Sequence, residues 1–234
     1  MITEAVVLAG GFGTRLRTVV SDVPKPMAPV NGSPFLHYLL EYLAAAGIKR
    51  IVLSVGYMAD KVKDHFGKQY CNMEIAYCYE ESPLGTGGGI RLALEKCKTE
   101  TVLVLNGDSF FAVPIAEYSE AHKKSNADAS LALREVEDGS RYGTIDLKNN
   151  RVTAFREKLE SLQGAALING GVYLLNRAFY LSHTPASTAF SIEYDFFAKQ
   201  AATAHLNGFV SSGYFIDIGI PEDYTRAQLE FGEQ

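Results

Sequence analysis

Tryptophan is absent from this sequence, cysteine is rare, and acidic residues outnumber basic ones. The three cysteines, Cys71, Cys78 and Cys97, are an odd number without a Cys-x-x-Cys spacing, which argues against a disulfide framework or a zinc site and indicates buried free thiols. With 22 lysines and arginines against 27 aspartates and glutamates, the net charge of −5 disfavours a nucleic-acid partner but permits a local basic pocket.

Long hydrophobic runs are missing as well. No stretch approaches the roughly 18 consecutive apolar residues of a membrane-spanning helix, and the N-terminus lacks the basic start and apolar run of a secretory signal. We therefore expect a cytoplasmic protein with no membrane partner. No internal repeat, low-complexity tract or linker divides the 234 residues, so we expect a single domain, 1–234.

Short apolar runs alternate with helical patterns in the first half of the chain. Continuous apolar runs are typical of strands covered on both faces, whereas three- and four-residue spacing is typical of helices. The expected strands are 5–8, 51–55 and 102–105, and the expected helices cover 35–46, begin after 58–60 and begin near Gly85. This order predicts an α/β fold with a Rossmann-like, mostly parallel mixed sheet flanked by helices, in which ligands bind at the carboxyl ends of strands.

Beyond about residue 128 the pattern becomes richer in short strands. These are expected at 129–133, 143–147, 151–155 and 171–175, with a turn at Asn149-Asn150. We expect this half, about 128–234, to build the acceptor side of a cleft that it shares with the first half, about 1–127.

The segment 8–16 reads Leu-Ala-Gly-Gly-Phe-Gly-Thr-Arg-Leu, and Lys25 follows it within Pro-Lys-Pro. It matches neither a P-loop nor a dinucleotide fingerprint. Glycines let backbone N–H groups face phosphate oxygens, and Arg15 and Lys25 supply cations, so we interpret the loop as a nucleoside triphosphate site. A tight turn with two surface cations is the alternative. The predicted nucleotide-binding residues here are Leu8, Ala9, Gly10, Gly11, Gly13, Thr14, Arg15 and Lys25.

A second glycine-rich segment, 84–90, opens the third expected helix. Its backbone can pack flat against a base or a ribose, which adds Gly85 and Thr86 to the nucleotide site. Asp108 and Asp217 each follow an apolar strand, where a carboxylate can hold a Mg²⁺ ion that also contacts substrate phosphates. We predict both as metal ligands, and Asp108 also as a nucleotide-binding residue. A helix cap or a turn is the alternative role for each.

Taken together, these motifs resemble the sugar-1-phosphate nucleotidyltransferase family along nearly the whole chain. The matching segments are 8–16, 24–26, 84–87, 106–108, 142–143, 157–158, 169–171 and 217–219. Leu159 departs from the pattern, since many members have proline there. The chain stops soon after segment 217–219, which leaves no room for the C-terminal β-helix of longer members.

The resemblance implies that a sugar 1-phosphate oxygen attacks the α-phosphorus of a nucleoside triphosphate and releases pyrophosphate. It implies catalytic roles for Arg15 at the β- and γ-phosphates, Lys25 near the α-phosphate and Lys158 at the sugar phosphate, with Mg²⁺ as cofactor. The first half then binds the nucleotide and the second the sugar phosphate. The implied acceptor-binding residues are Asp108, Tyr142, Gly143, Glu157, Lys158, Asn169 and Asp217. A surface ion pair is the alternative for Glu157 and Lys158.

The resemblance also bears on the base and the sugar. In the family, Glu80 falls where a polar side chain contacts the base edge. A carboxylate accepts from both N1–H and N2–H of guanine, whereas uracil has one such donor, so GTP is favoured; a glutamate in a solvated turn is the alternative. Segment 19–30 most resembles members that guanylylate D-glycero-α-D-manno-heptose 1-phosphate for bacterial surface glycans. Transfer to mannose 1-phosphate, uridylyl transfer and a non-catalytic nucleotide-sugar sensor are the alternatives, and the oligomeric state is left open.

Overall fold

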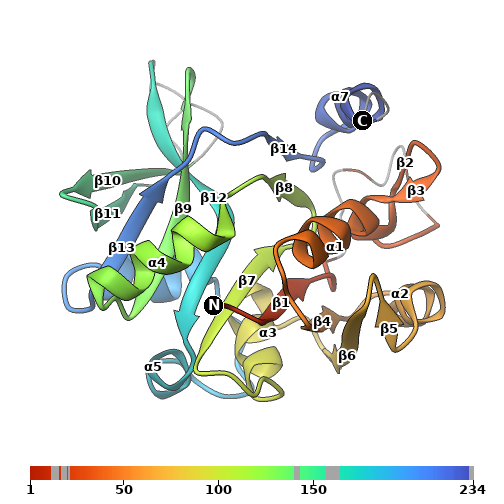
Figure 1. Ribbon diagram of the computed structural model, residues 1–234, viewed down its shortest axis with the longest axis horizontal. Helices are drawn as coiled ribbons and strands as arrows, with labels where there is room; N and C mark the ends of the chain where they lie inside the picture. The colour runs from red at the N-terminus through yellow and green to blue at the C-terminus, as the bar shows by residue number, and fades with distance from the viewer. Residues whose placement is uncertain (12–15, 17–19, 21, 140–142, 157–163, 232–234) are drawn as a thin grey trace.

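A ten-stranded mixed sheet runs through the computed structural model, which describes residues 1–11, 16, 20, 22–139, 143–156 and 164–231. The strand order is β10-β11-β13-β9-β12-β7-β1-β4-β6-β5 (Figure 1). The strands are β1 Glu4–Leu8, β4 Arg50–Val55, β5 Gln69–Tyr70, β6 Met73–Tyr79, β7 Thr101–Asn106, β9 Ala129–Val136, β10 Thr144–Lys148, β11 Arg151–Arg156, β12 Ala166–Asn176 and β13 Leu206–Val210. Two small ribbons pair β2 Pro29–Val30 with β3 Ser33–Pro34, and β8 Ser109–Phe111 with β14 Phe215–Asp217.

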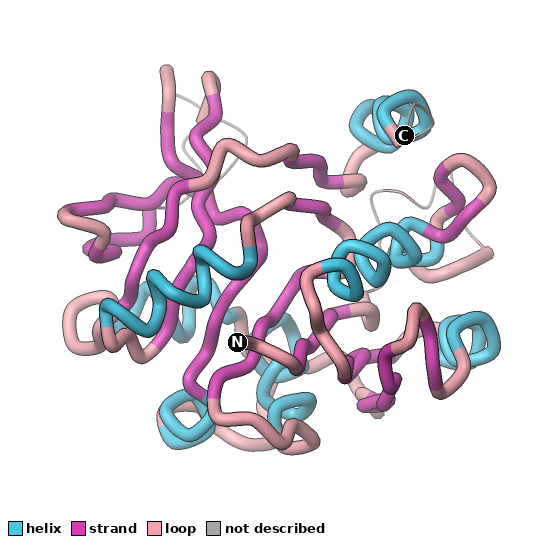
Figure 2. Tube along the Cα trace, in the orientation of Figure 1, coloured by secondary structure: helices cyan, strands magenta, loops and turns pink. Residues whose placement is uncertain are grey.

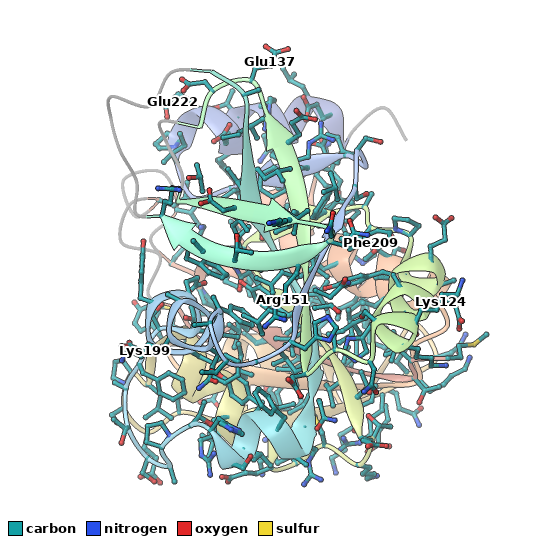
Figure 3. All side chains as sticks on the ribbon, turned by 90° about the vertical axis from the view of Figure 1, so that its left-hand side faces the viewer. Lys124, Glu137, Arg151, Lys199, Phe209 and Glu222 are labelled. Carbon is teal, nitrogen blue, oxygen red and sulfur yellow. The ribbon has the colours of Figure 1, made fainter. Side chains whose placement is uncertain are left out.

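Helices cover both faces of this sheet. They are α1 Phe35–Ala45, α2 Ala59–Phe66, α3 Gly85–Leu94, α4 Ile115–Ser125, α5 Arg177–Ser182, α6 Ala198–Gln200 and α7 Pro221–Glu230, with a 3-10 turn η1 Lys25–Met27 and a π-helical segment η2 Ile192–Phe197. Apolar residues of α1, α2 and α4 join one core, and those of α3, α5 and η2 join another. Figure 3 accordingly shows Lys124 on α4 and Lys199 on α6 on opposite sides of the sheet, both pointing outward.

The expected α/β class is confirmed, and the parallel pairing is concentrated in the first half. Strands β7, β1, β4 and β6 are parallel neighbours, whereas β12 pairs antiparallel with both β7 and β9. The chain leaves β1 through α1 to reach β4 on one side, and it reaches β7 on the other side through α3. Because α1 and α3 lie on opposite faces, the carboxyl ends of β1 and β7 form the topological switch point at which ligands bind in such sheets.

Local sequence signals account for several element boundaries. Helix α1 ends where Gly47 adopts a φ of +88°, a left-handed conformation that glycine adopts without strain. Asn149 and Asn150, with φ of 50° and 60°, join β10 to β11 as the predicted turn. The structure adds elements that these signals did not predict, notably β6, α4, β13 and α7.

The C-terminal helix α7 lies beside the hairpin β2–β3 that follows η1 (Figure 2). Tyr224 Oη and Gln228 Nε2 both donate hydrogen bonds to the carbonyl oxygen of Pro29, at 2.5 and 2.7 Å. Segment 217–219 is therefore followed by a helix that holds the chain just downstream of Lys25. Through Phe231, the described residues after Asp217 contain this helix and no β-helix.

The three cysteines are free, as expected, although only two of them are buried. Burial raises the pKa of Cys78 to about 11 and that of Cys97 to about 12, so both thiols stay protonated at neutral pH, while Cys71 is half-exposed. Among the described residues, no helix combines the length and the apolar character that a membrane crossing needs.

Candidate functional site

A cavity of about 410 Å³ opens at the carboxyl ends of β1 and β7. It is lined by Leu8, Gly10, Gly11, Lys25, Pro26, Glu80, Pro83, Gly85, Thr86, Asn106, Gly107, Asp108 and Gly219. Eight of these were predicted as nucleotide-binding residues: seven from the glycine-rich segments, Lys25 and the residue after β7, and Glu80 from the family resemblance. Parallel strands bring their carboxyl ends to one edge of the sheet, so residues about 100 positions apart in the chain meet there.

Lys25 and the two predicted metal ligands meet at one end of this cavity. Lys25 Nζ lies 2.6 Å from Asp108 Oδ2 and 3.4 Å from Asp217 Oδ1. The two aspartates are neighbours because β8 and β14 pair antiparallel, with Asp217 opposite Ser109, and because Ile218 N donates a hydrogen bond to Asp108 O. The ammonium group of a lysine that is only 8% exposed is thereby held between two carboxylates.

The charges of this triad favour a further cation. Burial and the neighbouring charge of Asp108 raise the pKa of Asp217, and Lys25 together with the Gly219 N–H offsets this only in part. No described residue donates a hydrogen bond to Oδ1 of Asp108 or to Oδ2 of Asp217, and both side chains are more than a third exposed. These two oxygens fit the hard, oxygen-rich coordination that Mg²⁺ prefers.

Glu80 forms another part of the cavity wall, and its carboxylate is held by protein donors. Ser54 Oγ, buried in β4, donates to Glu80 Oε1 at 2.9 Å, and Leu84 N donates to Oε2 at 3.2 Å. A Cβ at Gly89 would lie 2.8 Å from Oε1, and one at Gly10 would lie 3.1 Å from it, so glycine makes room for this carboxylate on both sides. Each oxygen keeps a lone pair for a further donor.

The glycines that open α3 make room for another segment of the chain. A Cβ at Gly87 would lie 2.1 Å from the Phe190 ring, and one at Gly88 would lie 2.7 Å from the Thr188 carbonyl oxygen. Gly85, at φ +68°, would collide with the Phe190 carbonyl at 2.6 Å. These glycines therefore accommodate segment 188–190, while Gly85 also lines the cavity. The approach of a base or ribose to this backbone stays a prediction.

Several lining residues were not predicted as site residues. A Cβ at Gly107 would lie 2.3 Å from the Leu8 carbonyl oxygen, so this position excludes a side chain, and one at Gly219 would lie 3.0 Å from Lys25 Nζ and would displace the end of that side chain. Asn106 presents a buried Oδ1 that has no hydrogen-bond partner among the described residues. All three lie in the segments 106–108 and 217–219 that carry the family resemblance. Their position next to Asp108 or Asp217 in the sequence could therefore have indicated that they line the site. Pro26 and Pro83 complete the unpredicted set.

Other predicted residues lie elsewhere. Ala9 is buried, and its N–H donates to Ser54 O. Asn169 Nδ2 donates to Tyr173 Oη at 2.7 Å and its Oδ1 accepts from Gly171 N, so its side chain is engaged within β12. Gly143 precedes β10 and does not line the cavity. Six predicted residues lie outside the described ones: Gly13, Thr14, Arg15, Tyr142, Glu157 and Lys158.

Comparison with known proteins identifies the family. The family model described as "Nucleotidyl transferase" matches residues 4–234. The chain belongs to the nucleotidyl transferase family. This confirms the predicted resemblance and makes the protein an enzyme of that family.

Individual relatives of this nucleotidyl transferase carry more specific names. It is 45% identical to a D-glycero-alpha-D-manno-heptose 1-phosphate guanylyltransferase of Aneurinibacillus thermoaerophilus, with 97% of each chain covered. The crystal structure of HddC from Yersinia pseudotuberculosis complexed with GMP-PN matches with a TM-score of 0.87 and 38% identity, covering 98% of this chain and 100% of that one. A mannose-1-phosphate guanylyltransferase of Mycobacterium tuberculosis is 36% identical over 97% of this chain, which spans 64% of that relative.

Proposed function

We propose that this nucleotidyl transferase moves a guanylyl group from GTP to D-glycero-α-D-manno-heptose 1-phosphate, giving GDP-heptose and pyrophosphate for a surface glycan. The reaction takes place in the cytoplasm, where nucleoside triphosphates are available. A non-bridging oxygen of the sugar phosphate forms a bond to the α-phosphorus of GTP, and the bond from that phosphorus to the β-phosphate breaks. Since the second pKa of a phosphate is about 6, the attacking oxygen is already anionic near pH 7 and needs no general base.

The arrangement of Lys25 between Asp108 and Asp217 is the observation that carries this proposal. Two polyanions must meet, so the barrier is lowered by positioning and by positive charge rather than by proton transfer. A buried ammonium at the edge of the cavity supplies a fixed positive group near the α-phosphate. Arg15 at the β- and γ-phosphates and Lys158 at the sugar phosphate complete the proposed cationic set, as the family resemblance implies.

Magnesium belongs to the same proposal. The three side chains of Lys25, Asp108 and Asp217 carry a net negative charge by themselves, which repels a triphosphate. A divalent ion held by Asp108 and Asp217 reverses that sign and, when bound, acts as a Lewis acid on phosphate oxygens. Asp108 and Asp217 would hold the ion, and Lys25, which contacts both carboxylates, would present its positive charge to the α-phosphate.

Glu80 supports guanine as the base. Its two oxygens, each with one protein donor, can accept the adjacent N1–H and N2–H of guanine side by side. Adenine and cytosine place an acceptor beside their donor on this edge, and uracil places a carbonyl on either side of one donor, so each brings an oxygen or nitrogen lone pair against the carboxylate. The likeness to relatives named as guanylyltransferases supports the same choice.

Mannose 1-phosphate is the second candidate acceptor, favoured by the relatives that are named for it. In this proposal the cavity residues contact the nucleotide and the phosphates. The choice of sugar depends on the acceptor-binding residues that the family resemblance implies, namely Tyr142, Gly143, Glu157, Lys158 and Asn169. This chain spans 97% of the relative named for heptose 1-phosphate but 64% of a relative named for mannose 1-phosphate. This difference supports heptose 1-phosphate as the acceptor.

A matrix of substrates tests the proposal. GTP, UTP, ATP, CTP and dTTP are each combined with heptose 1-phosphate and with mannose 1-phosphate, and pyrophosphate release is measured with and without Mg²⁺. We expect the highest kcat/KM for GTP with the heptose substrate and no release without the ion. A preference for UTP contradicts the role of Glu80, a preference for mannose 1-phosphate selects the second candidate, and nucleotide binding without pyrophosphate release identifies a non-catalytic sensor.

A further inference from the structure

Thr86 is the cavity residue that connects the glycine-rich start of α3 to a segment far along the chain. Its Oγ1 donates a hydrogen bond to Glu193 Oε2 at 3.0 Å, and it accepts one from Ile192 N, also at 3.0 Å. Ser191 Oγ donates to the same Glu193 oxygen at 2.6 Å. One carboxylate oxygen of Glu193 therefore accepts hydrogen bonds from two hydroxyl groups, one on α3 and one at the start of η2.

The surrounding backbone holds this contact in place. Gly87 N donates to Phe190 O at 2.9 Å, Phe190 N donates to Leu84 O at 3.0 Å, and Tyr180 Oη donates to Gly87 O at 2.9 Å. Segment 180–193 thus contacts the first turn of α3 through several hydrogen bonds. Because glycine at 85, 87 and 88 removes every Cβ in the way, this packing is close.

The contact restricts what the Thr86 hydroxyl can do. A hydroxyl has one proton and two lone pairs. Glu193 takes the proton and Ile192 N takes one lone pair, which leaves a single lone pair. Thr86 can therefore only accept a hydrogen bond from a ligand in the cavity, which suits an O–H or N–H of a nucleoside and disfavours a phosphate oxygen.

Glu193 is half-buried, and its side chain is held by the hydroxyl groups of Thr86 and Ser191. Glu193 itself does not line the cavity, so it touches no ligand there.

We propose that Glu193 is a positioning residue for nucleotide binding: it acts through Thr86, whose hydroxyl it fixes as a hydrogen-bond acceptor toward the nucleoside. This rests on the proposed function, because it assumes that GTP occupies the cavity. This role also connects the two halves of the chain, because Glu193 in the second half orients the Thr86 hydroxyl in the proposed nucleotide site of the first half.

The test compares Glu193→Ala, Glu193→Gln, Thr86→Val and the double variant Glu193→Ala/Thr86→Val. GTP affinity is measured by calorimetry, kcat and both KM values are measured by pyrophosphate release, and folding is monitored by Tm. We expect E193A and T86V each to weaken GTP binding and to raise KM for GTP about tenfold, with kcat and KM for the sugar phosphate changed less than about twofold. E193Q keeps an acceptor oxygen and stays near wild type, and the double variant is no worse than T86V.

Asp195→Asn is the matched control. Asp195 lies two residues further on, is exposed, and bonds Ser191 N and Lys199 rather than Thr86, so this variant leaves GTP affinity unchanged. An unaltered KM for GTP in E193A, additive losses in the double variant, or a loss in E193Q as large as in E193A overturns the proposal. If E193A does not fold, GTP affinity is compared between Thr86→Ser and T86V. The serine keeps the hydroxyl that donates to Glu193, so equal losses of GTP affinity in the two variants contradict the proposal.

The two proposals fail in different ways. Calorimetry reports GTP binding without turnover, so wild-type protein that binds GTP but releases no pyrophosphate contradicts the proposed reaction while the comparison of variants still stands. Wild-type protein that turns over normally, with E193A identical to it, contradicts the role of Glu193 alone.

Discussion

Lys25 Nζ and Asp108 Oδ2 lie 2.6 Å apart although 83 positions separate them in the chain. The lysine comes from a 3-10 turn after the first glycine-rich segment, and the aspartate comes from the turn between β7 and β8. Their contact places a buried positive charge and an accessible negative one at the same end of the cavity, where the proposed reaction requires a triphosphate and a metal ion.

Replacing Lys25 by alanine tests its catalytic role. We expect kcat to fall by about 10²- to 10³-fold, the range seen when one fixed group that stabilises transition-state charge is removed. Steady-state pyrophosphate release measures this, with Tm as the check on folding. Lys63→Ala, an exposed position on α2, is the control and keeps wild-type turnover. Near-normal kcat in K25A rejects the assignment.

Replacing Glu80 by glutamine tests base selection. The amide keeps one acceptor and turns the other into a donor, so we expect kcat/KM for GTP to fall by about tenfold to a hundredfold and the preference for GTP over UTP to shrink. Competition between the two nucleotides in one reaction measures the preference directly. The exposed neighbour Glu81 provides a matched control as E81Q. An undiminished preference for GTP in E80Q means that another group reads the base.

Glu4 governs part of the acid stability. It is 2% exposed and accepts hydrogen bonds from Lys98 N, Thr99 N and Arg50. Burial by itself raises the pKa of Glu4, but these bonds outweigh it and hold the pKa below its ordinary value of 4.5. A depressed folded pKa means that the stabilisation is complete above about pH 4.5 and is lost as the pH falls through the folded pKa.

The matching variant is Glu4→Gln. We expect it to lower the free energy of unfolding by about 3 kcal/mol at pH 7, as when one partner of a buried ion pair is removed. Urea unfolding at a series of pH values measures the difference between E4Q and wild type. This difference narrows below about pH 4.5. A difference that stays constant down to the acid transition shows that the Glu4 charge does not contribute.

Glycine at position 107 is required by the backbone of the neighbouring strand. In Gly107→Ala the new Cβ meets the Leu8 carbonyl at 2.3 Å, so we expect a loss of about 1 to 3 kcal/mol in the free energy of unfolding and a raised KM for GTP, because Leu8 lines the cavity. Gly11→Ala is the matched control for stability, since no atom of the residues that the structure describes lies within 4 Å of its Cβ. Equal Tm values for G107A and G11A contradict this account.

Local patterns in the sequence determined the fold class and many of the residues that line the cavity. Apolar runs, helical spacing and the Asn149-Asn150 turn report burial and backbone conformation, which depend mostly on adjacent residues. The glycine-rich segments and the aspartates after strands indicated a site because parallel strands share one carboxyl edge. These signals are local, and the sheet topology that they imply brings them together.

Only the tertiary structure decided which partners meet across the chain. The glycines of α3 face Phe190 and Thr188 rather than open space, and the Thr86 hydroxyl is tied to Glu193. Such contacts depend on how a segment 100 positions away packs against a helix, and no periodicity or propensity records that. The sequence by itself specified the kinds of groups needed to hold a polyanion, and the packing of distant segments set their distances and hydrogen-bonding roles.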